Sequence, residues 1–313
     1  MSKKEIYQKF CDKYPDIPIF SQPWYLDAVA GQDGWDILIS MRGQEIAATM
    51  PIIFKKKFGL KISNTPLLSK YLGPYFPPTF RSQKHQSKLI PNLIEQLPKV
   101  DFFQQSLHPN LSDWLPFYWK GFKGTTFYTF IIDPLDDLEQ VFQNFAPDYR
   151  NNKIPKAKNI IHIDTNRSIE DFYRVQEKTF DRQNMKMFLS LDHLKKYDAI
   201  LKKHNAREIF FAIDDDNQIH SVNYLIWDKN TAYLLMAGDD TKLRNSGAGI
   251  LLLWHTIQYV KNTLGLNRFD FLGSVIEPIT RVRRQFGAVQ TPYHFIEKHN
   301  SFLLKILHEW KKW

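Results

Sequence analysis

The chain has 313 residues, of which 43% are hydrophobic and 24% are charged, and its formal net charge at pH 7 is +9. This balance is typical of a folded globular protein and excludes a disordered chain. The length predicts two domains or one large one, and the basic charge favours anionic partners such as phosphates, nucleic acid or acidic lipid headgroups.

Cysteine and histidine usage narrows the class of protein further. Cys11 is the only cysteine, which excludes a disulfide framework and a cysteine-rich zinc site. The ten histidines show no H-x-x-x-H or H-E-x-x-H spacing, so we expect no metal site. The N-terminus has no apolar stretch of signal-peptide length, and no window approaches about 18 uninterrupted apolar residues. We therefore expect a cytoplasmic protein without a transmembrane helix.

The predicted elements fall into two similar series. In the first series, residues 35–53 alternate around a turn at Arg42 and Gly43, which predicts a β-hairpin. A helix at 82–97, a strand at 100–107, a short helix at 111–119 and a strand at 125–133 follow. The second series has a hairpin around a turn at 214–217, and then a strand, a helix, a strand, a short helix and a strand, over residues 207–227, 231–238, 247–264, 268–273, 278–286 and 291–298.

Short sequence repeats support a duplication. The pattern T-x-Y-x-F-I occurs at residues 126–131 and again at 291–296. Matching the hairpins and the last strands places the two copies about 170 residues apart. We therefore predict two domains, 1–135 and 136–313, of α/β class with mixed sheets flanked by helices (α+β mixed sheets). The polar segment 147–153 is expected to mark the crossing between them.

The best-defined local motif is R-x-x-G-x-G between a predicted strand and a predicted helix. Small residues there let backbone N–H groups approach an anion, to which the helix dipole and an arginine add positive charge. A pyrophosphate is the natural ligand for such a loop. The alternative is a glycine-rich helix start with Ser246 as the N-cap. The predicted cofactor-binding residues are Arg244, Ser246, Gly247, Ala248 and Gly249.

This motif and element order resemble the GNAT acyltransferase fold, and two copies in one chain resemble its FemAB-like branch. Five segments carry the resemblance: F-S-Q-P-W, Y-L-G-P-Y, Y-R-N-N-K-I-P-K-A, F-D-F-L-G and R-R-Q-F-G, at residues 20–24, 71–75, 149–157, 269–273 and 283–287. The sequence departs from the pattern at Ile154 and Pro155, where Arg is common, and the first segment is one residue short. It also lacks the coiled-coil insertion of some FemAB factors.

The resemblance implies acyl transfer to an amine without a covalent enzyme intermediate. The strand at 231–238 would hold the thioester carbonyl, and the loop would hold the pyrophosphate of coenzyme A. In FemAB proteins the donor is instead an aminoacyl-tRNA and the acceptor a peptidoglycan precursor. We expect an acyl-CoA donor such as acetyl-CoA in the second domain, because the phosphate loop is well formed and no coiled coil is present.

The first domain has no such loop, so we expect it to serve the acceptor, an amine of a cell-envelope or polysaccharide precursor. Its predicted substrate-binding residues are Trp24, Tyr71 and Gly73; Arg283 of the second domain matches a basic residue that is thought to meet a phosphate in the FemAB proteins. Core packing explains the tryptophan equally well.

Three residues are candidates for the acid–base steps of amine attack: Tyr224, Asp239 and Tyr293. Each has a structural alternative, since Asp239 also fits a loop acid and the tyrosines fit packed strand aromatics. The amphipathic tail 302–313 fits a packed C-terminal helix or a peripheral membrane contact. Three functions remain open besides acyl-CoA transfer: an aminoacyl-tRNA-dependent transferase, a non-catalytic binding module, and a nucleic-acid-binding protein, which the absence of a known reader motif disfavours.

Overall fold

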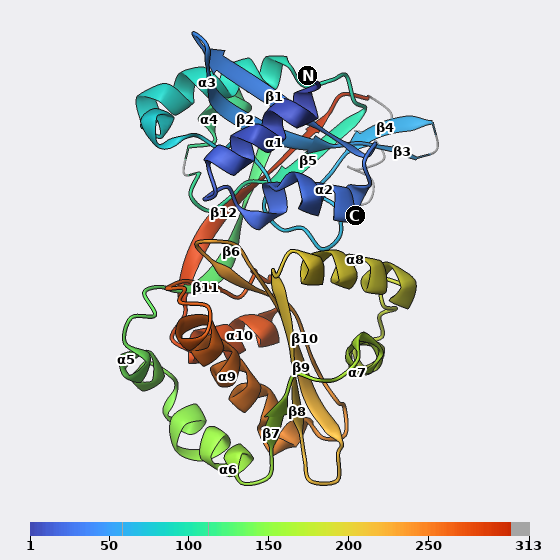
Figure 1. The fold of residues 1–313 in the computed structure, drawn as a ribbon, viewed down its shortest axis with the longest axis vertical. Coiled ribbons are helices and arrows are strands. Elements are labelled where there is room, and N and C mark those ends of the chain that lie inside the picture. The colour runs from blue at the N-terminus through green and yellow to red at the C-terminus, as the bar shows by residue number, and fades with distance from the viewer. Residues whose placement is uncertain (58, 112, 302–313) are drawn as a thin grey trace. The chain divides into compact units, whose positions relative to one another are not determined.

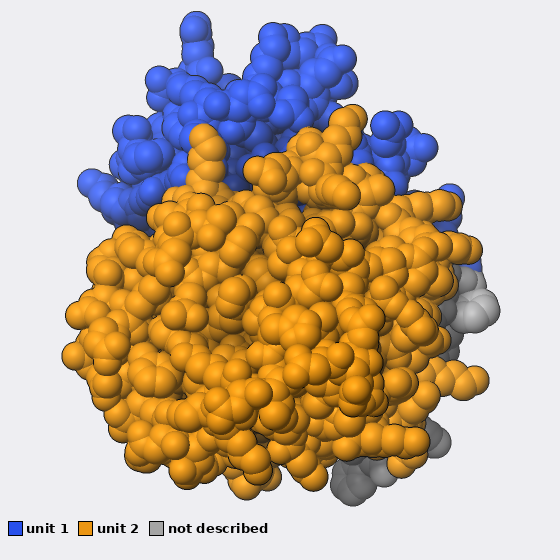
Figure 2. Space-filling view, turned by 60° about the horizontal axis from the view of Figure 1, so that its bottom comes forward, with its two compact units in different colours: residues 1–128, 292–313 blue, residues 129–291 orange. Residues whose placement is uncertain are grey.

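The computed structural model describes residues 1–57, 59–111 and 113–301. It divides into two compact units, which Figure 2 shows in different colours. Unit 1 contains residues 1–128 and, of the described chain, 292–301, whereas unit 2 contains residues 129–291. The amphipathic tail 302–313, for which a packed helix or a peripheral membrane contact was predicted, lies outside the described residues.

Unit 1 combines a hairpin, a small sheet and covering helices (Figure 1). The hairpin strands β1 and β2 pair antiparallel, and the sheet order is β3-β4-β5-β12. Both faces of the hairpin are largely buried: Leu38 of β1 and Met50 of β2 lie in the core, and so do all residues of β2 from 47 to 53. The elements are α1 (Lys3–Lys13), α2 (Pro23–Ala30), β1 (Trp35–Arg42), β2 (Glu45–Ile53), β3 (Lys55–Lys57), β4 (Leu60–Ser63), α3 (Gln83–Glu95), β5 (Phe102–Ser106), α4 (Leu115–Trp119) and β6 (Lys123–Ile132), with 3₁₀ turns at Ile19–Ser21 and Pro78–Phe80.

Unit 2 is a mixed sheet with the strand order β6-β11-β10-β9-β8-β7. Helix α9 packs on it through Leu252, Ile257 and Val260, which are fully buried. The elements are α5 (Leu138–Gln143), a π-helical turn (Tyr149–Lys153), α6 (Ile154–Lys158), β7 (His162–Asp164), α7 (Ile169–Arg182), α8 (Leu191–Lys203), β8 (Arg207–Ile213), β9 (Ile219–Trp227), β10 (Ala232–Asp239), the 3₁₀ turn η4 (Arg244–Ser246), α9 (Ala248–Asn262), β11 (Phe269–Asp270), α10 (Glu277–Gln285) and β12 (Val289–His299).

Two strands run from one unit into the other. Strand β6 ends against β11 of unit 2, where Ile132 pairs with Phe269. Strand β12 returns to unit 1, where Phe295 pairs with Ser106 of β5. The last strand of each repeat therefore pairs with a strand of the other repeat. The compact units therefore differ from the predicted ranges 1–135 and 136–313, although the roles predicted for the two domains remain predictions.

The structure confirms the α/β class with mixed sheets, and both predicted hairpins form. The predicted crossing at 147–153 is wrong, because residues 149–153 form the π-helical turn inside unit 2. The strand predicted at 268–273 is shorter than expected, because Leu272 and Gly273 have positive φ values of 52° and 37°. Buried Asp270 fixes this turn by accepting a hydrogen bond from the Leu272 N–H at 2.7 Å.

The single cysteine is shielded within unit 1. Cys11 lies on α1 with 4% of its surface exposed, and burial raises the pKa of its thiol to about 12. Because the thiolate is the reactive form, the native thiol is expected to stay unreactive at about pH 8. Ellman's reagent should label it only after unfolding in guanidinium chloride. Rapid labelling of the native protein would contradict this burial by showing that α1 opens.

Among the described residues, no helix has the length and apolar character that a membrane crossing requires.

Candidate functional site

The R-x-x-G-x-G segment joins β10 to α9, as the sequence predicted. Arg244 to Ser246 form one 3₁₀ turn, Gly247 takes a left-handed conformation with φ of 81°, and α9 begins at Ala248. The Ser246 Oγ accepts a hydrogen bond from the Ala248 N–H at 3.3 Å. Arg244 is exposed. The first turn of a 15-residue helix thus lies beside a solvent-facing guanidinium, an arrangement that attracts anions.

Both motif glycines are also required by packing. A Cβ at Gly247 would lie 3.0 Å from the Lys153 carbonyl oxygen and 3.5 Å from the Ala157 Cβ. A Cβ at Gly249 would lie 2.7 Å from the Asp239 Oδ1. The segment Y-R-N-N-K-I-P-K-A therefore packs under the loop through the π-helical turn and α6. Substitution at either glycine would disturb this packing, so the arginine is the better probe of ligand binding.

The two acids at the end of β10, Asp239 and Asp240, have different environments. Asp240 is 6% exposed, and its carboxylate pairs with Lys178 of α7 at 2.6 Å. Burial alone would raise the pKa of Asp240, but the hydrogen bonds from Lys178 and from the Lys242 N–H outweigh it and lower that pKa. Asp239 instead lies against the first turn of α9. Its predicted catalytic role remains a prediction, and its position beside the loop is compatible with it.

The other two catalytic candidates are buried tyrosines in different units. Tyr224 of β9 is fully buried, and its hydroxyl donates to Asp198 at 2.7 Å, while Arg207 pairs with the same carboxylate. Tyr293 belongs to unit 1, where its ring meets Tyr71 edge-on with centroids 5.1 Å apart. The structure therefore gives both tyrosines packing partners, which is the structural alternative that the sequence left open.

Three of the predicted substrate-binding residues belong to unit 1 and one belongs to unit 2. Tyr71 is 1% exposed in unit 1, and a Cβ at Gly73 would lie 3.1 Å from the Leu107 side chain. Trp24 on α2 is half-buried and packs against Tyr25. Arg283 lies half-buried on α10 in unit 2. Of this set, Tyr71 contacts a catalytic candidate, Tyr293.

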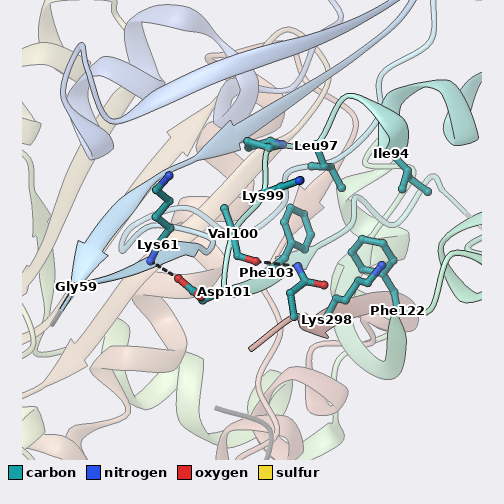
Figure 3. Close-up of a pocket in the computed structure, with 12 residues that line it drawn as sticks. Gly59, Lys61, Ile94, Leu97, Lys99, Val100, Asp101, Phe103, Phe122 and Lys298 are labelled. Atoms are coloured by element: carbon teal, nitrogen blue, oxygen red, sulfur yellow. Dashed lines mark hydrogen bonds between the residues drawn. The ribbon is translucent and has the colours of Figure 1, made fainter. Parts of the chain in front are cut away.

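A pocket of about 610 Å³ lies in unit 1 (Figure 3). Phe103 and Phe122 supply part of its apolar wall, and Asp101 accepts a hydrogen bond from the Lys61 backbone N–H at 2.8 Å. The Lys298 ammonium lies over the Phe122 ring, 5.1 Å from its centroid. None of the residues predicted from the sequence to bind a donor or an acceptor lines this pocket.

A hydrogen-bonded group of three polar residues beside the loop, centred on buried His220, was not predicted. His220 at the start of β9 is 5% exposed, and its Nδ1 lies 2.9 Å from the Ser246 Oγ. Its Nε2 lies 2.9 Å from the Asp214 Oδ2 in the turn between β8 and β9. The three residues are six and 26 positions apart in the chain, so no local spacing could identify them. Only the hairpin register brings this turn to the loop.

The described residues also contain no group of three or more His, Cys, Asp or Glu side chains placed to hold a metal ion.

Comparison with known proteins locates a family domain in unit 2. Residues 152–277 match the acetyltransferase (GNAT) domain family, a stretch that includes β10, the loop and α9. No curated protein matches the sequence.

Three solved structures share the architecture at low identity. The structure of FemX superposes with a TM-score of 0.74 at 12% identity, over 98% of each chain. A tandem GNAT protein from the clavulanic acid biosynthesis pathway, solved without AcCoA, gives 0.55 at 9% identity over 85% of this chain and 83% of the other. L-PGS from Bacillus licheniformis gives 0.51 at 12% identity over 88% and 87%. At these identities the likeness shows the fold alone.

Residues 152–277 of unit 2 thus match the acetyltransferase (GNAT) domain family, and the chain as a whole shares its fold with FemX and with a tandem GNAT protein, in agreement with the sequence motifs.

Proposed function

We propose that the chain transfers an acyl group from acyl-CoA to an amine of a cell-envelope or polysaccharide precursor, and that it works in the cytoplasm. The observation that carries this proposal is the junction of β10, η4 and α9, with its helix start and exposed Arg244. The pyrophosphate of coenzyme A would accept hydrogen bonds from backbone N–H groups there, and the guanidinium would offset its charge.

The shape of β10 supports a place for the thioester. The pairing of β10 with β9 shifts register between Leu234 and Met236, so Leu235 is the extra residue of a β-bulge. A bulge interrupts the regular ladder and re-aims backbone groups. The resemblance to GNAT proteins implies that a backbone N–H of this strand donates a hydrogen bond to the thioester carbonyl. A preorganised donor of that kind stabilises the negative charge that develops on the carbonyl oxygen.

The proposed reaction has one covalent step. The amine nitrogen attacks the thioester carbon, a C–N bond forms, the C–S bond breaks, and the thiol leaves with a proton. The attacking amine must lose a proton, directly or through water. We assign this role to Asp239, because the two tyrosine candidates are packed against other side chains. For the acceptor we retain Trp24, the half-exposed member of the predicted set, and Arg283.

An aminoacyl-tRNA donor with a peptidoglycan-precursor acceptor is the second candidate. The likeness to FemX, which is greater than that to the tandem GNAT protein, favours it. The helices in the described part of unit 2 argue against a coiled-coil contact with tRNA. Helices α7, α8 and α9 have 14, 13 and 15 residues, which is short for a coiled coil. Surface lysines would remain available to bind the tRNA of such a donor.

Calorimetry with acetyl-CoA, followed by filter binding with aminoacyl-tRNA, tests the donor. The acyl-CoA proposal expects micromolar binding of acetyl-CoA and activity that survives RNase. Binding of tRNA that weakens steeply with salt, combined with loss of activity after RNase, would replace the proposal with the second candidate. Binding of neither donor would indicate a non-catalytic module.

A further inference from the structure

The contact between Ser246 and His220 differs from two other serine–histidine pairs in the chain. Ser82 lies 3.1 Å from the Nδ1 of His85, and Ser190 lies 2.7 Å from the Nδ1 of His193. Both pairs are exposed contacts between an N-cap and the third residue of its helix. The contact of Ser246 with buried His220 joins a helix start to a strand 26 positions away. It also continues to a third group, Asp214.

The turn between β8 and β9 fixes the Asp214 carboxylate. Its Oδ1 accepts a hydrogen bond from the Gln218 N–H at 2.8 Å. Its Oδ2 accepts one from the Gln218 side-chain amide at 3.2 Å and lies 2.9 Å from the Nε2 of His220. The hydrogen bond with His220 lowers the pKa of Asp214. The carboxylate is therefore ionised at neutral pH and acts only as an acceptor. The Nε2 of His220 must carry the hydrogen of this bond.

This constraint decides the direction of the next hydrogen bond. In a neutral ring with hydrogen on Nε2, Nδ1 is an acceptor, so the Ser246 hydroxyl donates its hydrogen to His220. The Ser246 oxygen then offers only lone pairs, and one of them accepts the Ala248 N–H. When the ring gains a proton, Nδ1 becomes a donor. The hydroxyl hydrogen of Ser246 is then released and can turn toward an anion at the start of α9.

We propose that His220 is a positioning residue that sets whether Ser246 can donate to an anion at the Arg244–Gly249 loop, so that anion binding is coupled to proton uptake by His220. The proposal rests on the proposed function, in which that anion is the donor's pyrophosphate. His220 touches no substrate in this role. It acts through the serine hydroxyl, and Asp214 holds its ring in the required tautomer.

The surrounding charges favour this coupling. Asp214 faces the ring from the β8–β9 turn. Asp239 and Asp240 lie at the end of β10, and Lys178 of α7 is paired to Asp240. The Asp240 N–H also donates to the His220 carbonyl oxygen at 2.9 Å. A protonated ring thus has a directly bonded carboxylate to offset its charge, and Arg244 on the loop favours the incoming anion.

Nitrogen NMR of the histidine rings tests the tautomer without a donor. Comparison with His220→Asn assigns the signals of His220, and we expect the neutral ring to carry hydrogen on Nε2. Addition of inorganic pyrophosphate should convert these signals to those of the doubly protonated ring. The opposite tautomer, or signals that pyrophosphate leaves unchanged, would overturn the proposal.

Proton linkage is the second readout. Acetyl-CoA affinity of the wild type should fall as pH rises, by up to about tenfold per pH unit for one linked proton. His220→Asn and Ser246→Ala should each flatten this dependence relative to the wild type, while His193→Asn should keep it. The titration of the ligand itself cancels in these ratios. Equal pH dependence in all four proteins would contradict the coupling.

These readouts separate the two proposals. If acetyl-CoA fails to bind the wild type while pyrophosphate protonates His220, the acyl-CoA donor is wrong and the positioning role stands. If acetyl-CoA binds with no change at His220, the donor proposal stands and the positioning role falls. Ser246→Ala removes one half-exposed hydroxyl and serves as the second variant if His220→Asn unfolds, which thermal unfolding would reveal.

Discussion

Arg244→Glu is expected to weaken acetyl-CoA binding about tenfold to a hundredfold without unfolding the protein. A hydrogen bond between charged groups contributes about 1.5–3 kcal/mol, and about 1.4 kcal/mol corresponds to a tenfold change in affinity. Arg244 is exposed on η4, so its replacement leaves no buried group without a partner. Glutamate adds repulsion of the phosphates to the loss of attraction.

Lys196→Glu provides the control for this variant. It makes the same change of two charges on an exposed position of α8 in the same unit. Calorimetry at two salt concentrations should show a small, screened effect for the control and a larger, less screened one for Arg244→Glu. Equal affinities of Arg244→Glu and the wild type would remove the loop as the donor site. Equal losses in both variants would reduce the effect to net charge.

The glycines of the same loop are less suitable probes. Gly247 combines a φ of 81° with a Cβ position 3.0 Å from the Lys153 carbonyl oxygen. A glutamate there would strain the backbone and push on the π-helical turn, whatever the loop binds. Lost binding in such a variant would therefore not distinguish a phosphate site from a packing contact, whereas the exposed arginine does distinguish them.

Local patterns predicted the elements of this fold, because each depends on neighbouring residues. Alternation with period two predicted the hairpins at 35–53 and 207–227, and helical spacing together with a small-residue loop predicted the start of α9. The end of β11 was missed because its turn depends on the Asp270 carboxylate, which receives a hydrogen bond from the hydroxyl of Thr129, 141 residues earlier. Such a contact leaves no local signal.

The pairing of the last strands could not be predicted from the repeat. Thr126–Ile131 and Thr291–Ile296 have the same pattern, so either segment suits either sheet edge. The structure pairs the end of β6 with β11 and the end of β12 with β5. The choice between these edges depends on the chain's overall path. The hydrogen-bonded group of Asp214, His220 and Ser246 could not be predicted for the same reason, because only the folded β8–β9 hairpin assembles it.

Tyr224 has two interpretations, a catalytic one and a packing one, which a single variant can distinguish. From the sequence it was a candidate acid or base, but its hydroxyl donates to Asp198 inside unit 2. Tyr224→Phe is therefore expected to cost about 1 kcal/mol of stability through one lost hydrogen bond. If the role is packing, kcat stays near the wild-type value. A large fall in kcat with little change in stability would restore the catalytic interpretation.

Asp198→Ala is expected to destabilise unit 2 by about 3–5 kcal/mol, the usual loss when one partner of a buried ion pair is removed. The Asp198 and Arg207 side chains are 11% and 14% exposed, and their atoms lie 2.7 Å apart. Without the carboxylate, the guanidinium of Arg207 and the hydroxyl of Tyr224 both lose an acceptor. The second ion-pair contact of Arg207, with Glu208 at 3.7 Å, is too long to replace it.

Urea unfolding followed by far-ultraviolet circular dichroism measures this loss. Glu170→Ala is the matched control, because it also breaks an ion pair with a residue of α8, that of Glu170 with Lys195, but at side chains more than 40% exposed. Solvent screens such a pair, so little change is expected. Equal stability of Asp198→Ala and the control would show that water reaches Arg207. The Tyr224 hydroxyl would then be accessible as well, and its catalytic role would need renewed testing.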